Sequence, residues 1–238
     1  MEELNNPQQA QRIQTSVING AERRLLVWLA ERQPRWVKPD LLTFVGTFGA
    51  FLVGLGFVLT CHGIGWLWLS VGGLLVNWYG DSLDGSLARV RGCQRPVYGY
   101  YLDHTVDCIN EAFMFVGAGL SPLVHLDLAL LLFILYLFMT INVSMNAHLK
   151  SEFRLTYAKL GPTEFRILVA LFCIMLTAFP QVATFRFSVG DMGGKDVLLS
   201  SLDLLAVVLI VLLSIIYVCT IIGDARKYAK QDPPHKQQ

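Results

Sequence analysis

Four aspartates stand close together in this sequence, and their spacing gives them a shared chemistry. Asp81 and Asp84 are three residues apart, and Asp103 and Asp107 are four residues apart. Residues three or four apart lie on one face of an α-helix, so each pair projects from one side of its helix. If the two helices meet antiparallel across a short loop, all four carboxylates converge. Carboxylates without histidine or cysteine partners favour a hard cation, which predicts Mg²⁺, with Mn²⁺ as the alternative.

The residues around these acids point to phosphate chemistry. Mg²⁺ usually keeps water and phosphate among its ligands, so a carboxylate-rich Mg²⁺ site implies a phosphorylated substrate. Arg89 follows Asp84 closely and can neutralise charge that develops on a phosphate. Gly85 and Gly99 remove side chains beside the acids, which either leaves room for a bulky ligand such as a nucleotide or serves close helix packing.

The elements that must position these residues are transmembrane helices. The chain has 238 residues, of which 54% are hydrophobic and 16% are charged, and its mean hydropathy is +0.49. A helix needs about 20 apolar residues to cross a bilayer. Stretches of that kind occur at 41–61, 64–83, 100–121, 123–147, 164–184 and 197–222. We therefore predict an all-α integral membrane fold with six transmembrane helices and the acids at the ends of the second and third.

The basic residues predict how these helices are oriented. Seventeen of the nineteen Lys and Arg residues fall before the first stretch, after the sixth, in the second and fourth connections or, for Arg166, at the start of the fifth stretch next to the fourth connection. The positive-inside rule then places both termini and the active site on the cytoplasmic side. The net charge of +1 gives no reason to expect nucleic acid as a partner.

The chain divides into three predicted parts. Residues 1–38 form a cytoplasmic N-terminus, in which 21–32 has opposed apolar and charged faces and predicts an amphipathic helix lying in the membrane interface. Residues 39–223 form the six-helix catalytic domain, and residues 224–238 form a cytoplasmic tail.

The motif as a whole resembles a known signature. It reads Asp81-x2-Asp84-Gly85-x2-Ala88-Arg89 and then Gly99-x3-Asp103-x3-Asp107. This pattern is similar to that of the CDP-alcohol phosphotransferase (CDP-alcohol phosphatidyltransferase) family, whose members make phospholipids in a six-helix membrane fold. The connection between the two halves is nine residues long here, whereas the family usually has seven or eight.

The resemblance implies a reaction and roles for the acids. A substituted phosphate would pass from a CDP-linked donor to a hydroxyl acceptor, with release of CMP. Asp81, Asp84 and Asp103 would hold two divalent metal ions. Asp107 would act as a further ligand and as the base that takes the proton of the hydroxyl. Two versions stay open: CDP-diacylglycerol with a polar alcohol, or CDP-choline or CDP-ethanolamine with diacylglycerol.

The resemblance also implies a nucleotide side and a homodimer. Gly85, Ala88, Arg89 and Gly99 match the positions that accommodate the cytidine and its phosphates. On the acceptor side the sequence is less specific. Arg154, Lys159 and Arg166 could bind a phosphate or could form an ordinary basic cytoplasmic loop. His104 either contacts a substrate or packs beside the metal site.

Two other functions are compatible with acids in membrane helices. A Mg²⁺-dependent prenyl-diphosphate transferase would need a second acidic motif on distant helices. A non-enzymatic cation pathway would need polar residues that continue across the membrane. The sequence favours neither. The last three stretches contain no second acidic cluster, and the outer halves of the second and third stretches supply few polar residues.

Overall fold

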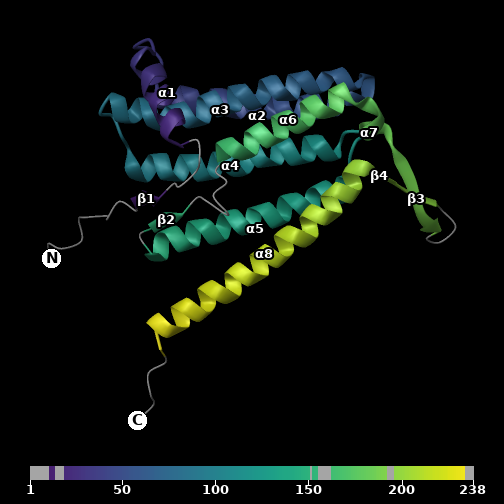
Figure 1. Ribbon diagram of the computed structural model, residues 1–238. Coiled ribbons are helices and arrows are strands. Elements are labelled where there is room, and N and C mark those ends of the chain that lie inside the picture. Colours follow the sequence, from purple (N-terminus) through teal and green to yellow (C-terminus); the bar gives the residue numbers. More distant parts are fainter. Residues whose placement is uncertain (1–10, 14–18, 151, 155–161, 192–195, 234–238) are drawn as a thin grey trace.

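The computed structural model describes residues 11–13, 19–150, 152–154, 162–191 and 196–233. Within this part of the chain, six long helices account for most of the molecule (Figure 1). Each corresponds to one of the six apolar stretches. They are α2 (Pro39–Val58), α3 (Leu67–Val90), α4 (Pro96–Gly119), α5 (Leu126–Lys150), α6 (Pro162–Ala178) and α8 (Ser201–Gln231).

Shorter elements connect the long helices. They are α1 (Asn19–Glu31), the 3-10 turns η1 (Leu59–His62) and η2 (Ile64–Trp66), the short helix α7 (Pro180–Thr184), and the strands β1 (Gln11–Ile13), β2 (Glu152–Arg154), β3 (Arg186–Asp191) and β4 (Asp196–Ser200). The strands pair as two small ribbons, β1 with β2 in parallel and β3 with β4 antiparallel. The sequence did not predict these ribbons.

Three segments of the described chain are long and apolar enough to cross a membrane: Pro39–His62, Leu126–Asn146 and Ser201–Gln231. α3 and α4 are 24 residues long, but the acidic residues they carry lower their hydropathy, and α6 has only 17 residues. The outer face of α8 exposes a row of large apolar side chains, as a surface in contact with lipid does. The prediction of a helical membrane protein is confirmed, while the number of six spans stays a prediction.

The structure corrects the bounds of the last two apolar stretches. The fifth stretch is interrupted after Ala178, because Pro180 cannot donate the hydrogen bond that would continue the helix. The sixth stretch starts in β4 rather than in a helix. α8 then continues as a regular helix to Gln231, past the boundary at residue 223 that the sequence suggested.

Glycines set the distance between α2 and its two neighbours. A Cβ atom on Gly80 would overlap the backbone of Gly46, and one on Gly117 would overlap the backbone of Gly54. Small residues of this kind let helix backbones touch. α2 therefore packs directly against both α3 and α4, and it holds the two acid-bearing helices in a fixed relation.

One end of the bundle carries α1, the α3–α4 connection and the C-terminal ends of α5 and α8, whereas the α2–α3 connection and the β3–β4 hairpin lie at the other end (Figure 1). Arg91 ties the first end together by donating to the carbonyl oxygens of Gln33, Pro34 and Val37. This arrangement fixes the linker between α1 and α2 against the end of α3.

α1 is also joined to the bundle by a shared carboxylate. Glu22 Oε1 accepts a hydrogen bond from Trp78 Nε1 at 2.9 Å and another from Thr163 Oγ1 at 2.6 Å. Trp78 belongs to α3 and Thr163 to α6. The helix predicted around residues 21–32 is therefore present, while its position in a membrane interface stays a prediction.

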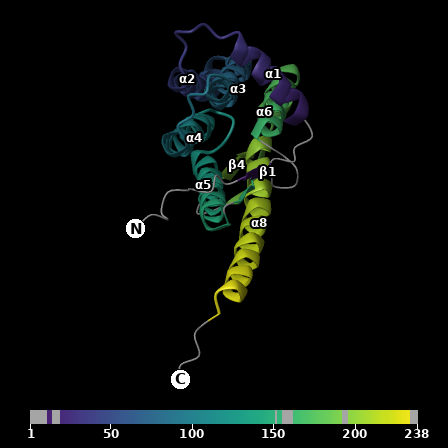
Figure 2. The same cartoon turned by 90° about the vertical axis from the view of Figure 1, so that its left-hand side faces the viewer.

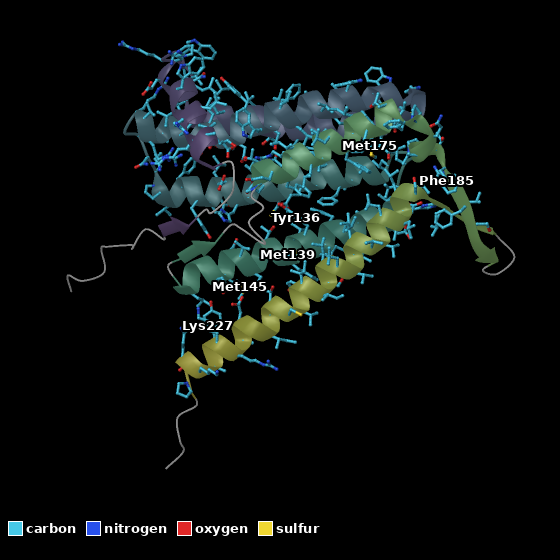
Figure 3. The ribbon with its side chains drawn as sticks, in the orientation of Figure 1. Tyr136, Met139, Met145, Met175, Phe185 and Lys227 are labelled. Carbon is cyan, nitrogen blue, oxygen red and sulfur yellow. The ribbon has the colours of Figure 1, made fainter. Side chains whose placement is uncertain are left out.

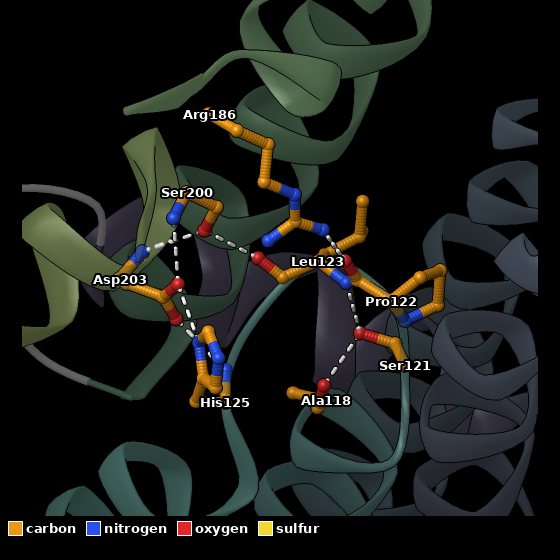
Figure 4. A network of polar contacts seen from close by, with 8 residues as sticks. All are labelled: Ala118, Ser121, Pro122, Leu123, His125, Arg186, Ser200 and Asp203. Carbon is orange, nitrogen blue, oxygen red and sulfur yellow. Dashed lines mark hydrogen bonds and ion pairs between the residues drawn. The ribbon is translucent and has the colours of Figure 1, made fainter. Parts of the chain in front are cut away.

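The opposite end is joined by a network around Asp203 (Figure 4). Asp203 and Ser200 form a capping box at the start of α8. Both Asp203 oxygens also accept from His125, one from its backbone nitrogen at 2.8 Å and one from Nδ1 at 2.7 Å. Ser200 Oγ donates to Leu123 O at 2.8 Å. The α4–α5 connection is thereby fixed to α8.

Two apolar clusters enclose the acid-bearing stretch. One lies toward the far end of the bundle and consists of Val53, Phe57, Leu67, Leu74, Leu123, Cys173, Leu176, Ala183 and Leu202. The other lies where α1 meets α2 and α3 and consists of Leu26, Ala30, Val37, Leu42, Leu83 and Leu87.

In the turned view, α5 and the diverging α8 lie apart from α2 and α3 (Figure 2).

Candidate active site

Three of the four aspartates meet between α3 and α4. One carboxylate oxygen from each of Asp81, Asp103 and Asp107 lies within 4.8 Å of the others. Oxygen ligands of one octahedral Mg²⁺ lie about 3 to 4 Å apart, because the Mg–O bonds are about 2.1 Å long. Small side-chain movements would therefore bring the three oxygens onto a hard cation, and the all-oxygen donor set fits that class of ion.

Asp84 lies beside this group and is held from α2. Its Oδ2 accepts a hydrogen bond from Thr43 Oγ1 at 2.7 Å, and its Oδ1 lies 2.5 Å from the backbone nitrogen of Gly85. The charges of Asp81 and Asp103 act on it. The structure therefore brings three of the acids into one cluster and places the fourth next to them.

Arg166 contributes positive charge to the cluster from α6. Its Nη2 lies 2.5 Å from Asp81 Oδ2, and its Nε donates to Asn77 Oδ1 at 2.9 Å. Asn77 in turn donates to Gly46 O at 3.0 Å. The sequence offered Arg166 as a phosphate ligand or as part of an ordinary basic loop, and it gave Asn77 no role, although Asn77 precedes Asp81 by one helical turn.

The other two basic residues proposed for the acceptor side are Arg154 and Lys159. Lys159 lies outside the described residues, and only the backbone of Arg154 is described, in β2. Arg166 is the member of this set whose side chain the structure places at the acids.

Gly85 and Gly99 differ from the packing glycines of α2. A Cβ atom on Gly99 would meet nothing within 4 Å, and one on Gly85 would meet only Arg89 Nη1 at 3.5 Å. Close helix packing therefore does not explain these two glycines. Arg89 lies exposed on the last turn of α3, and its Nη2 donates to Ser86 Oγ at 3.0 Å. Ala88 is partly buried on the same turn.

His104 packs on its own helix and also reaches the cluster. Its ring stacks on Tyr100 with 4.1 Å between the ring centres, and its Nδ1 lies 3.0 Å from Tyr100 O. The same nitrogen is 3.8 Å from Asp103 Oδ2. His104 is therefore positioned beside a predicted metal ligand.

Two residues that the sequence did not single out, Glu111 and Tyr136, lie deeper than the aspartates. Glu111 follows Asp107 by one turn of α4, and its charge acts on Asp107 and on Tyr136. Tyr136 lies on the side of α5 that faces α4 (Figure 3). Its ring centre is 5.8 Å from that of Phe115 and 6.4 Å from that of Phe165. Glu111 could have been noticed as a carboxylate inside an apolar stretch.

The polar face of α4 ends at the level of Glu111. Met114 and Ala118, the next residues on that face, pack against the far apolar cluster. Among the described residues, one group of three carboxylates is close enough to hold a metal ion. Neither a polar path across the bundle nor a second acidic motif is therefore seen in the described part, which disfavours both alternatives.

A comparison with known protein families identifies the family of this chain. The profile of the CDP-alcohol phosphatidyltransferase family matches residues 36–222, which include the four aspartates of the motif and Glu111. The chain belongs to this family. The resemblance read from the motif is confirmed.

Several curated proteins of this kind are similar to parts of the chain. The phosphatidylinositol phosphate synthase of Cutibacterium acnes is 38% identical over 84 residues, which is 35% of this chain and 38% of that protein. Cholinephosphotransferase 1 of Gallus gallus is 25% identical over 204 residues, 79% of this chain and 60% of that protein. The archaetidylinositol phosphate synthase of Pyrococcus horikoshii is 33% identical over 95 residues, 40% of this chain and 47% of that protein. Each alignment spans less than two thirds of the relative's length.

Proposed function

We propose that this protein transfers a substituted phosphate from a CDP-linked donor to a hydroxyl acceptor, releases CMP and forms a phospholipid. The observation that carries the proposal is the meeting of Asp81, Asp103 and Asp107 within a chain of the CDP-alcohol phosphatidyltransferase family. The names of the relatives, which include synthases and a cholinephosphotransferase of lipid metabolism, support the same reaction class.

The acids divide the work between metal binding and proton transfer. Asp81, Asp84 and Asp103 hold divalent metal, with Asp107 as a further ligand; two Mg²⁺ ions are expected, and Mn²⁺ is an alternative. When bound, such ions neutralise the donor's diphosphate and the CMP leaving group. The oxygen-only donor set and the spacing of the three acids support this assignment.

Asp107 is the proposed base. It takes the proton from the acceptor hydroxyl, whose oxygen forms a new bond to the donor phosphorus while the bond from that phosphorus to the CMP oxygen breaks. Arg89 stabilises the negative charge on the transferring phosphate. No covalent enzyme intermediate is needed, because acceptor and donor meet at one site.

The nucleotide side lies at the facing ends of α3 and α4. Gly85, Ala88 and Gly99 leave room for the cytidine and its phosphates, and Arg89 binds the phosphates. The open space around Gly99 supports this, since no neighbouring side chain accounts for a glycine there. Thr43 orients Asp84 through its hydrogen bond.

We further propose that all six long helices span the membrane, with α1 in the interface and both termini and the active site on the cytoplasmic side. Residues 1–38, 39–223 and 224–238 then form the N-terminal segment, the catalytic domain and the tail. The collection of α1, the α3–α4 connection and the end of α8 at one end of the bundle supports this (Figure 1). A homodimer is proposed from the family resemblance.

The direct test measures CMP release by the purified full-length protein in lipid nanodiscs. CDP-diacylglycerol is offered with polar alcohols, and CDP-choline and CDP-ethanolamine are each offered with diacylglycerol. We expect CMP and the matching phospholipid from one donor class, loss of activity with EDTA, and recovery with Mg²⁺. If prenyl diphosphate were turned over and no CDP-linked donor released CMP, the proposed function would be wrong.

A further inference from the structure

Two buried polar atoms on α4 have no hydrogen-bond partner in the described part of the chain. They are Oδ1 of Asn110 and Oε2 of Glu111. Asn110 as a whole is buried, with an exposed fraction of 6%. These positions follow Asp107 by three and four residues, so both lie beside it on the same helix face and one turn deeper.

Asn110 and Glu111 are the innermost residues of the polar region, because apolar side chains follow them on the same face of α4. Met114 and Ala118, the next residues on that face, belong to the packing of the far apolar cluster. Tyr136 lies close enough to Glu111 for the two side chains to interact electrostatically. Its ring contacts that of Phe115 on α4 and that of Phe165 on α6. The pair therefore forms a polar floor below Asp107.

A buried carboxylate oxygen and a buried amide oxygen without partners are unfavourable, and the packed structure offers no compensation for either. In membrane helices, ionisable groups of this kind mark binding or transport sites. An ionised carboxylate and an amide oxygen accept hydrogen bonds, so a ligand that satisfies them must supply donors.

We propose that Asn110 and Glu111 bind the acceptor, which is a small unphosphorylated alcohol with a hydrogen-bond donor besides its reacting hydroxyl. The second donor is another hydroxyl or an ammonium group. This proposal rests on the proposed function and selects CDP-diacylglycerol as the donor. Diacylglycerol has one hydroxyl and no other donor, so it would leave both oxygens unpaired. A phosphorylated alcohol would bring negative charge next to Glu111.

The geometry fits a small acceptor. One helical turn, about 5.4 Å, separates the level of Asp107 from that of Glu111. A polyol or amino alcohol can place one hydroxyl at Asp107 and a second donor at the floor. The reacting hydroxyl then faces the proposed base, while the rest of the molecule is held by acceptors that do not take part in the chemistry.

The first experiment is an acceptor panel with the full-length protein in nanodiscs. CDP-dioleoylglycerol is offered with glycerol, myo-inositol, ethanolamine, serine or sn-glycerol 3-phosphate, and CDP-choline is offered with dioleoylglycerol. We expect phospholipid from a neutral polyol or an amino alcohol, and the separate arms tell these two apart. Product only with the phosphorylated alcohol or only with dioleoylglycerol would overturn the inference and leave the proposed function standing. No CMP from any pair would overturn both.

Variants of Glu111 test the residue itself. Glu111→Gln should raise the KM for the acceptor about ten- to a hundredfold, the loss expected for a hydrogen bond to a charged group, and leave the KM for the donor unchanged. Asp127→Asn, the same change at an exposed site on the far end of α5, should alter neither. An equal fall in kcat with every acceptor, with KM unchanged, would contradict the inference.

The variant Glu111→Leu distinguishes a role of Glu111 in acceptor binding from a role in the stability of the fold. Removal of an unpaired buried acid should not lower the thermal unfolding temperature, because similar replacements in other proteins are neutral or stabilising, whereas acceptor binding should be lost. If this variant unfolded at a clearly lower temperature than the parent protein, Glu111 would be a structural residue and the inference would be wrong.

Discussion

The two ends of the bundle use aspartate in opposite ways. At the far end, Asp203 is fully buried and both of its oxygens are satisfied, by Ser200 and by the backbone and ring of His125. At the other end, Asp107 faces the carboxylates of Asp81 and Asp103. The first arrangement stabilises a fold, because each acceptor meets a donor. The second brings like charges together and needs a cation.

The same difference separates the glycines. Gly80 lies where a side chain would overlap the backbone of α2, whereas Gly99 has free space around it. One glycine is required by packing, and the other is not. Residue type alone therefore does not distinguish a structural from a functional position, but its surroundings do.

The largest expected effect is on activity, from Asp107→Asn. Loss of the proposed base and of one metal ligand should lower CMP release about 10³- to 10⁴-fold. The thermal unfolding temperature should not fall, since the substitution reduces repulsion among the acids. CMP release and unfolding in the same nanodisc sample check both parts. Retained activity with loss of a cation flux would instead support the pathway alternative.

Gly80→Ala should harm folding, with a cost of about 3 kcal/mol or more, because the added methyl group would overlap backbone atoms of Gly46 and Leu42 on α2. Gly99→Ala is the matched control and should leave unfolding unchanged while raising the KM for the CDP-linked donor. Detergent-solubilised yield, unfolding temperature and donor KM are measured for both. Equal destabilisation by the two variants would show that packing requires a glycine at position 99 as it does at position 80.

Asp203→Asn should lower stability by about 2 to 3 kcal/mol, because its amide group would face donors that the carboxylate now satisfies. The kcat of the folded fraction should stay within about twofold, since Asp203 lies in the first turn of α8, which starts at the end of the bundle opposite the α3–α4 connection (Figure 1). Unfolding temperature and kcat per folded molecule test this. A large fall in kcat without a change in stability would contradict the structural role.

Arg166→Lys should have the smallest effect of this series, a fall in activity of about tenfold. A lysine keeps the positive charge near Asp81 but cannot bond Asp81 and Asn77 together as the guanidinium does. Arg166→Gln, which also removes the charge, should be the more severe of the two. If both variants were equally active, Arg166 would not position Asp81.

Several features could be read from the sequence because they are local. The spacing of the acids follows from helix periodicity, and the six apolar stretches follow from hydropathy, so the helices and the meeting of Asp81, Asp103 and Asp107 were predictable. The breaks at Ala178 and in β4 were missed, because a continuous apolar stretch hides a proline interruption and a short strand.

Other features depend on contacts between distant parts of the chain. Glycine packing on α2 places Thr43 against Asp84, and α6 delivers Arg166 to Asp81 from 85 residues away. The sequence determined which residues carry charge and which helix face they share, since both are properties of neighbouring residues. The tertiary structure decided which charges are satisfied, because that depends on what other helices bring: partners for Asp203, and none for Oε2 of Glu111 in the described chain.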